Sequence, residues 1–377
     1  MNQRIIFEHG GIRLLGRIAS ELQIKKPLLV TGGASYEACG AKQEIEQVFG
    51  DSGNIRFSVS TSLPEIQEVE RGIEFLNKHT FDAVIAIGGG CVLDTAKLIR
   101  TFAHRDIKTI TESSGHTSSE SPRIPMIAIP TTAGSGAEAT HFAVLYKNNT
   151  KYSIAHQNIL PTVALIDANL TLSVPPNLAA ASGLDALSQG IESYWSANST
   201  EESRGFAKQS IQLAYEALVS AICENNLQAK INLSQAALLA GQAINISKTT
   251  APHAVSYALT VTFGIPHGHA VALTLGEFFA LAGAITDKDC NHPTGMGFVS
   301  HLLDELCNLL NVADPSAGRA AIKKLVSTLG LATNLSAVGI KESDFAHILK
   351  NINVERLENH PQKITAEMIR TILQNIA

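Results

Sequence analysis

The stretch FDAVIAIGGG at residues 81–90 constrains the fold more than any other part of this sequence. Its unbroken run of Val, Ile and Ala predicts a strand buried on both faces, and the helical pattern VLDTAKLIRTFA follows directly after the glycines. Similar apolar runs alternate with helical patterns along about the first 170 residues: KPLLVTGG, IRFSVS, IPMIAIPTTAGSG and TVALIDANL. Strands that alternate with helices predict a mostly parallel sheet with helices on both faces.

The pattern changes after SVPPNL at 173–178, because nearly every later segment has helical periodicity and is rich in Ala and Leu. A chain of 377 residues is long enough for about two domains. We therefore predict an α/β domain over 1–175 and an all-α domain over 176–377, with a hinge at Pro175-Pro176. Ligands of such proteins tend to bind between domains, at the carboxyl ends of the strands.

Composition argues against several classes of function. The chain carries 29 Lys and Arg against 34 Asp and Glu, a net charge of −5, without a basic cluster, so we expect neither nucleic acid nor a membrane surface as a partner. No apolar stretch reaches the roughly 18 residues that span a membrane, and the first 20 residues show no signal-peptide pattern. The five cysteines are scattered, without a C-x-x-C pair, which predicts a reducing, cytoplasmic location.

Two loops that follow predicted strands have the composition of phosphate-binding segments. Gly88-Gly89-Gly90 lies where a strand leads into a helix, so its backbone could approach a phosphate beside the unpaired N–H groups of the helix N-terminus. A tight turn without a ligand explains three glycines equally well. The second loop, PTTAGSGAE at 130–138, adds hydroxyl groups and favours a nucleotide. Neither loop is a Walker loop or a G-x-G-x-x-G fingerprint, so the residues by themselves only suggest a dinucleotide site.

Asp185 and Gln189 lie one helical turn apart in GLDALSQGIES, so both side chains reach one point. A hydrogen-bonded pair is the common explanation of this spacing, and a metal site is the rarer one. Further along, the stretch at 248–273 holds three histidines: His253 starts a predicted helix, His267 follows a proline in a short loop before the next helix, and His269 is the third. Each histidine singly is more typical of a structural or surface residue. Together these five residues offer N and O ligands, which suit Zn²⁺ or Fe²⁺ better than Mg²⁺ or Ca²⁺.

Four motifs in this order resemble the iron-containing (group III) alcohol dehydrogenases: GGGCVLDTAK, PTTAGSGAEAT, PPNLAAASGLDALSQGIES and PHAVSYALTVTFGIPHGHAVAL. The resemblance covers essentially the whole chain. It implies the dehydroquinate synthase-like fold, in which a dinucleotide-binding (Rossmann-like) domain precedes a helical domain and the active site lies in the cleft. It also implies NAD or NADP as cofactor, a divalent metal (Fe²⁺ or Zn²⁺), and a homodimer or larger homo-oligomer.

The family pattern also assigns roles to residues of this chain. By resemblance, the metal ligands are Asp185, Gln189, His253 and His267. The predicted cofactor contacts are Gly88, Gly89, Gly90 and Asp94 at the pyrophosphate, Thr131, Thr132 and Ser135 at the nicotinamide end, and Lys151 at the nucleotide.

Three positions depart from the family pattern. Gln189 stands where the second metal ligand is usually His, so either its carbonyl oxygen binds the metal or an open coordination position remains. Tyr257 stands where many members have another His near the substrate, and it either donates a proton or shapes the pocket. Gly32 stands where NAD-preferring members often have Asp, which removes the repulsion of a 2′-phosphate, although no Arg or Lys follows closely.

The resemblance implies reversible hydride transfer between the nicotinamide and a small aldehyde, with the metal as Lewis acid. The stretch around His253 and His267 is most similar to members that act on phosphonoacetaldehyde or a similar anionic aldehyde, for which Lys248, His156 and His269 are candidate basic contacts. One alternative is a dehydroquinate synthase-type lyase, which shares the fold, NAD and the metal. Another is a nucleotide-binding homologue that has lost catalysis, which Gln189 motivates.

Overall fold

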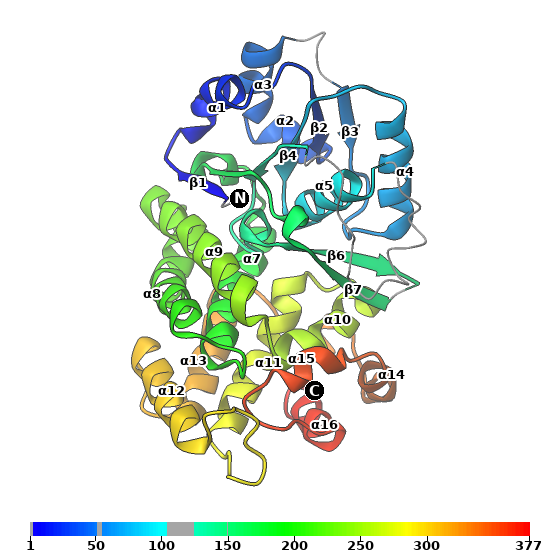
Figure 1. The fold of residues 1–377 in the computed structure, drawn as a ribbon. Helices are drawn as coiled ribbons and strands as arrows, with labels where there is room; N and C mark the ends of the chain where they lie inside the picture. Colours follow the sequence, from blue (N-terminus) through cyan, green and yellow to red (C-terminus); the bar gives the residue numbers. More distant parts are fainter. Residues whose placement is uncertain (1–2, 51–54, 104–123, 149) are drawn as a thin grey trace. The chain divides into compact units, whose positions relative to one another are not determined.

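The computed structural model describes residues 3–50, 55–103, 124–148 and 150–377 (Figure 1). The chain divides into two compact units, Met1–Val174 and Pro175–Ala377. The predicted hinge at Pro175-Pro176 lies at this division, and its movement stays a prediction. Each unit has hydrophobic core clusters of its own.

A parallel sheet of six strands forms the centre of the first unit, in the order β1-β8-β5-β4-β2-β3. The strands are β1 (Arg4–Phe7), β2 (Pro27–Thr31), β3 (Ile55–Ser58), β4 (Ala83–Gly88), β5 (Met126–Pro130) and β8 (Val163–Ile166). The strand predicted from FDAVIAIGGG is β4, which is buried along its whole length. The predicted parallel sheet is thus confirmed.

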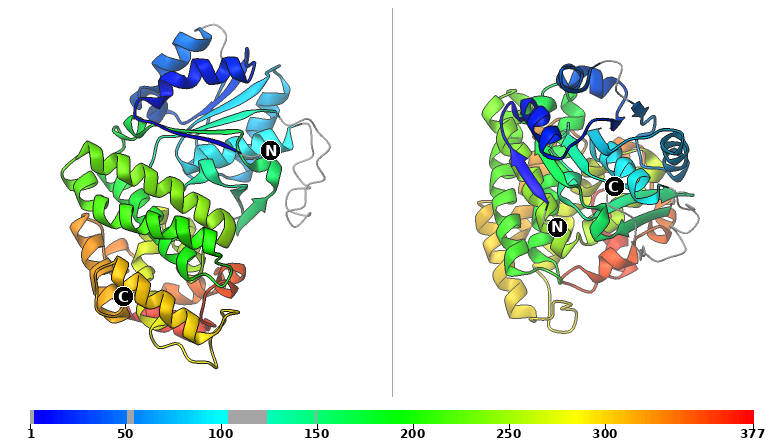
Figure 2. Two further views of the ribbon diagram at one scale, coloured as in Figure 1. Left: turned by 60° about the vertical axis from the view of Figure 1, so that its left-hand side comes forward. Right: turned by 45° about the horizontal axis from the view of Figure 1, so that its top comes forward.

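Helices cover both faces of this sheet, as Figure 2 shows. Successive strand residues point to opposite faces, so Leu28 and Val30 belong to one core cluster and Leu29 to the other. The first cluster includes residues of α4 and α5, and the second includes residues of α1, α2 and α3. These helices are α1 (Leu15–Glu21), α2 (Ala34–Ala38), α3 (Ala41–Phe49), α4 (Ile66–Asn77) and α5 (Gly90–Phe102). Short 3-10 turns are η1 (Gly11–Leu14), η2 (Ala137–Ala139), η3 (Gln157–Ile159) and η4 (Ala168–Thr171).

Three strands were not predicted from the sequence. Two of them, β6 (Phe142–Lys147) and β7 (Thr150–Ala155), pair antiparallel in a separate two-stranded sheet. The third is β1 at the edge of the parallel sheet. All three are only partly buried, whereas β4 is buried along its whole length. The apolar run FAVLY in β6 was nevertheless a usable signal.

The second unit is helical, as predicted. Its helices are α7 (Pro176–Trp195), α8 (Glu201–Cys223), α9 (Leu227–Ser247), α10 (Ala251–Phe263), α11 (His267–Ala282), α12 (Met296–Leu309), α13 (Pro315–Thr328), α14 (Phe345–Lys350), α15 (Val354–Glu358) and α16 (Ala366–Asn375). Two 3-10 turns are η5 (Ser336–Val338) and η6 (Glu342–Asp344). The side chains of Thr200, Asn226 and Asp314 cap α8, α9 and α13. Among the described helices, none is both long and apolar enough to cross a membrane.

Helix α7 is the central element of this unit. It packs against α8, α9 and α11, and nearly all of its residues after Ala180 are buried. A helix buried on every side normally carries only apolar residues. Besides two buried serines, α7 therefore stands out for three larger polar side chains: Asp185, Gln189 and Glu192 are all buried. They follow the spacing i, i+4, i+7 and so share one helix face.

Candidate metal centre and nucleotide-binding loops

Three helices of the second unit bring Asp185, His253 and His267 together. One ligand atom of each residue lies within 4.8 Å of the others. Asp185 and His253 are buried, and His267 is half-buried. The residues come from α7, α10 and α11, so distant parts of the sequence supply them. The site thus joins one carboxylate and two imidazoles, the donor set that Zn²⁺ and Fe²⁺ prefer.

A glycine contact between α7 and α11 makes this approach feasible. A Cβ atom at Gly268 would lie 1.9 Å from the carbonyl oxygen of Ala181 and 2.7 Å from the Cβ of Asp185. Only a residue without a side chain fits there. Gly268 directly follows His267, so the same contact brings this histidine to Asp185. His267 was predicted in a loop, and this was wrong: it is the first residue of α11, because Pro266 starts the helix as its N-cap.

Gln189 lies beside Asp185, one turn further along α7. Its amide donates a hydrogen bond to the Asp185 carboxylate and helps to lower the pKa of Asp185. Burial acts in the opposite direction, but the hydrogen bond from His253 and the nearby His267 outweigh it. Oε1 of Gln189 is buried and takes part in no hydrogen bond with the described residues, and the buried Oδ1 of Asp185 contacts only Nε2 of His253 among them, at 3.3 Å. Buried acceptor oxygens next to two imidazoles fit a divalent cation, so the residues present match the metal that the family implies.

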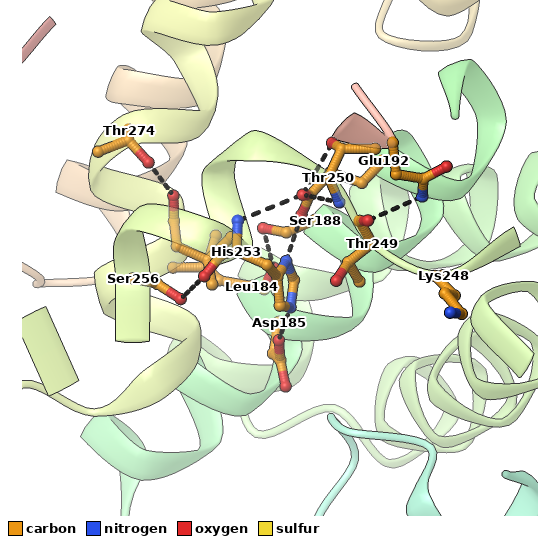
Figure 3. Close-up of polar contacts among 12 residues, drawn as sticks. Leu184, Asp185, Ser188, Glu192, Lys248, Thr249, Thr250, His253, Ser256 and Thr274 are labelled. Carbon is orange, nitrogen blue, oxygen red and sulfur yellow. Dashed lines mark hydrogen bonds and ion pairs between the residues drawn. The ribbon is translucent and has the colours of Figure 1, made fainter. Parts of the chain in front are cut away.

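His253 is held between two carboxylates (Figure 3). Its Nε2 lies 3.3 Å from Oδ1 of Asp185, and its Nδ1 makes a short contact with Oε2 of Glu192. Burial disfavours the charged ring, but Glu192 and Asp185 together raise the pKa of His253 to about 10. Protons and a metal ion therefore compete for Nε2. Sequence reasoning did not find Glu192, although its spacing from Asp185 and Gln189 on α7 was a usable signal.

Tyr257 reaches the same site from α10, one turn beyond His253. Its ring stacks on the His267 ring, with centroids 5.7 Å apart and an angle of 13° between the planes. The centroid of the His253 ring lies 6.4 Å away. The structure thus brings Tyr257 to the candidate metal ligands. Its two predicted roles, donating a proton and shaping the pocket, both stay predictions.

In the first unit, the two glycine loops lie side by side at the carboxyl ends of β4 and β5. The backbone N–H of Thr131 donates to the carbonyl oxygen of Gly88 at 3.0 Å. A Cβ atom at Gly89 would lie 3.4 Å from Thr132, and one at Gly90 would lie 2.7 Å from Oγ of Ser135. The loops contact each other at the edge of the sheet where α/β proteins bind nucleotides. Their contacts with a cofactor stay a prediction.

Asp94 was predicted at the pyrophosphate, but its carboxylate has protein partners. It accepts a hydrogen bond from the backbone N–H of Val144 at 3.0 Å and lies 3.5 Å from Nζ of the buried Lys97. Burial raises the pKa of Asp94, and Lys97 and Lys151 oppose this change. These contacts hold β6 to α5, which favours a structural role for Asp94. The electrostatic effect of Lys151 places this residue of β7 near the same carboxylate.

Arg56 lies beside Gly32, which the sequence alone did not indicate. The sheet places β3 next to β2, and Nη2 of Arg56 donates to the carbonyl oxygen of Gly32 at 3.2 Å. Nε donates to Oγ1 of Thr31 at 2.8 Å, and Nη1 pairs with Glu37 at 3.2 Å. The guanidinium also lies over the ring of Tyr36, 4.5 Å from its centroid. A cation thus stands at the end of β2, where NAD-preferring members of the family were expected to have a carboxylate often.

The three basic candidates for an anionic substrate have other partners. Lys248 pairs with Glu355 at 2.7 Å, and Nδ1 of His156 accepts a hydrogen bond from the backbone of Asn158. Burial lowers the pKa of His269, and its Nε2 lies 2.7 Å from the carbonyl oxygen of Ala332. Burial thus favours the neutral form of His269.

Comparison with known proteins places these features in a family. The model described as "Iron-containing alcohol dehydrogenase" matches residues 2–168, and the model of the C-terminal part of the Fe-containing alcohol dehydrogenase family matches residues 179–377. Phosphonoacetaldehyde reductase of Streptomyces viridochromogenes is 32% identical over 78% of this chain and 75% of its own. Long-chain-alcohol dehydrogenase 1 of Geobacillus thermodenitrificans is 30% identical over 82% and 79%. Among solved structures, sulfoacetaldehyde reductase from Bifidobacterium kashiwanohense in complex with NAD⁺ superposes with a TM-score of 0.85 at 29% identity, covering 100% of this chain and 97% of that one.

Proposed function

Because this chain belongs to the iron-containing alcohol dehydrogenase family, and is thus an NAD(P)-dependent oxidoreductase acting on CH–OH groups, we propose that it reduces a small aldehyde at the site of Asp185, Gln189, His253 and His267. The convergence of a buried carboxylate and two imidazoles carries this proposal. A divalent metal bound there would act as a Lewis acid on the carbonyl oxygen of the substrate.

The side chains around this point have separate roles in the proposal. Asp185 supplies a negative charge beside the cation, and the two imidazoles supply neutral nitrogen donors. Gln189 contributes its carbonyl oxygen. The Tyr257 hydroxyl is the group that would donate a hydrogen bond or a proton to the substrate oxygen.

The first unit supplies the cofactor site in this proposal. The backbone of Gly88, Gly89 and Gly90 would approach the pyrophosphate. Side chains at Gly88 and Gly90 would collide with Val92 and Ser135, so glycine is the residue that fits at these two positions. Thr131, Thr132 and Ser135 would contact the nicotinamide half, and Lys151 the nucleotide.

We infer further that the chain accepts NADPH. The end of the strand next to the glycine loop is where Rossmann-type proteins recognise the ribose 2′ position, with an acid for NAD and an arginine nearby for NADP. Here Gly32 removes the acid and Arg56 supplies the arginine. Arg56 uses three of its N–H groups within the described structure, and a guanidinium has five, so it keeps donors for a phosphate.

For the substrate, we propose a short aldehyde with an anionic group, such as phosphonoacetaldehyde. Two relatives support this: one is named phosphonoacetaldehyde reductase and the other sulfoacetaldehyde reductase. Both named substrates are two-carbon aldehydes with an anionic tail. Lys248, His156 and His269 have partners within the protein, so they do not support an anionic substrate. The proposed substrate class therefore rests on the similarity to these two relatives.

The test is a panel of aldehydes with each cofactor and metal. The chain is purified without added metal, its metal content is measured, and iron, zinc or manganese is restored in turn. Oxidation of NADPH and NADH is followed with phosphonoacetaldehyde, lactaldehyde, succinic semialdehyde and butyraldehyde. We expect turnover restored by one metal and fastest with phosphonoacetaldehyde. Equal turnover of the uncharged butyraldehyde would contradict the anionic substrate.

The same panel decides between the main proposal and its alternatives. No turnover with any metal, despite cofactor binding, would favour a lyase of the dehydroquinate synthase type or a homologue that only binds the nucleotide. The homo-oligomer and the cytoplasmic location stay predictions. Light scattering of the purified chain would measure the first of these directly.

A further inference from the structure

We propose that Glu192 is a positioning residue that holds His253 with Nδ1 protonated and Nε2 directed to the metal. This inference rests on the proposed metal site and goes beyond it, since Glu192 is not one of the proposed metal ligands. The side chain is completely buried on α7, two turns beyond Asp185. A buried carboxylate without a partner would be costly, so its contacts determine what it does.

Both carboxylate oxygens of Glu192 face the start of α10 (Figure 3). Oε1 accepts hydrogen bonds from the backbone N–H of Thr250 at 2.9 Å, from the Thr250 hydroxyl at 3.0 Å and from the backbone N–H of His253 at 3.3 Å. Oε2 contacts Nδ1 of His253. One side chain thus binds both the backbone and the ring of the same histidine.

These contacts determine which ring nitrogen of His253 carries a proton. Oε1 accepts from three donors, and in the proposal Oε2 accepts as well, so Nδ1 is the donor in this contact. When the ring is neutral, Nε2 is left with its electron pair, 3.3 Å from Asp185 and directed to the point shared with His267. Metal-binding histidines are commonly oriented in this way by a carboxylate on the other nitrogen.

The contact also orients the helix that carries His253. Thr250 is the N-cap residue of α10 and makes no side-chain cap of its own. Instead, Oε1 of Glu192 accepts from the first N–H groups of the helix, and a negative charge at a helix N-terminus is favourable. The Thr250 hydroxyl in turn accepts from Nε1 of Trp195 at 3.0 Å. Buried hydrogen bonds from Glu192 and Trp195 thus connect α7 to the start of α10.

The charge of Glu192 matters because Gln189 is neutral. Asp185 is the one carboxylate among the candidate ligands in the described part of the chain, so the two acids together would balance a divalent cation. Burial penalises any uncompensated charge, so Glu192 supplies the second negative charge without occupying a coordination position.

The test replaces the carboxylate with an amide of the same shape, Glu192→Gln. Two backbone N–H groups face the Oε1 position and can only donate, so the amide oxygen must stay there and the NH₂ group must face Nδ1 of His253. The ring then accepts at Nδ1 and carries its proton on Nε2, where the metal should bind. We expect the affinity for Zn²⁺ or Co²⁺, titrated into metal-free protein, to fall about 10- to 100-fold.

Two further variants separate positioning from a general structural effect. Glu192→Asp keeps the charge, so we expect it to recover part of the affinity that Glu192→Gln loses. The matched control is Ser188→Ala, which removes another buried polar group of α7. The Ser188 hydroxyl donates instead to the carbonyl oxygen of Leu184, on its own helix, at 2.6 Å. We expect Ser188→Ala to bind metal like the wild type, with an unchanged visible spectrum of bound Co²⁺.

Metal affinity and the proton on Nδ1 together decide the proposal. Equal metal affinity of folded Glu192→Gln and wild type would overturn it. If the variant does not fold, nitrogen-15-edited NMR of the wild-type chain shows whether Nδ1 of His253 carries a hydrogen-bonded proton, and its absence would also overturn the proposal. A wild-type chain that binds no divalent metal would instead refute the proposed metal site. The NMR measurement would still decide how Glu192 acts on His253.

Discussion

Substituting Gly268 by alanine tests whether close contact between α7 and α11 builds the metal site. The added Cβ would lie 1.9 Å from the carbonyl oxygen of Ala181 and 2.8 Å from the backbone nitrogen of Asp185. Real Cβ atoms essentially never lie closer than 3.0 Å to such atoms, so the two helices must separate by at least about 1 Å. Both contacts are with backbone, which cannot move aside as a flexible side chain could.

The expected loss follows from the position of Gly268 next to His267. Metal sites keep their ligand distances within about 0.2 Å, so a shift of about 1 Å removes His267 from a site shared with Asp185. We expect metal affinity to fall at least about 100-fold, since a ligand is displaced rather than merely reoriented. Overpacking should also cost about 1–3 kcal/mol of folding stability.

The assay measures metal content after dialysis, aldehyde reduction and the thermal unfolding midpoint of Gly268→Ala. The control is Gly205→Ala on α8, because a Cβ atom there meets nothing within 4 Å. Alanine favours a helix by about 1 kcal/mol over glycine, so this control should be neutral or stabilising. Full metal content and wild-type turnover in a folded Gly268→Ala variant would refute the reasoning.

Three other predictions address the ligand set, the cofactor and a buried histidine. Gln189→His adds an imidazole nitrogen and should slow the loss of zinc to a chelator about tenfold; an unchanged rate would mean that residue 189 does not bind the metal. Arg56→Met should lower kcat/KM about tenfold or more with NADPH and leave it within about twofold with NADH, because a charge-assisted hydrogen bond contributes about 1.5–3 kcal/mol; equal losses with both cofactors would argue against recognition of the 2′-phosphate. His360 is buried against the rings of Trp195 and Phe278, and burial lowers its pKa to about 3. The unfolded chain therefore binds a proton below about pH 6.5 that the folded chain does not, which should lower stability by about 1.4 kcal/mol per pH unit below that value. His360→Phe should remove this component, as measured by urea unfolding at neutral and mildly acidic pH; an unchanged pH dependence would show that His360 is not its source.

The local patterns of the sequence were sufficient for the main architecture. The apolar run before Gly88 predicted a buried parallel strand, and the helical periodicity after Pro176 predicted a helical second half. Asp185 and Gln189 were predicted to share a helix face. All three rest on interactions between residues close in the chain, where the strand and helix periods alone determine which side chains lie together.

Only the tertiary structure decided which distant residues meet. Pairing of β3 with β2 lets the Arg56 side chain reach Gly32, just after β2, although 24 positions separate them. Packing of α7 on α10 brings Glu192 to His253, and Gly268 lets α11 approach Asp185. The physical reason is that such contacts depend on how whole elements pack, and a periodic pattern states only which face of an element is buried, not which residue of another element it will meet.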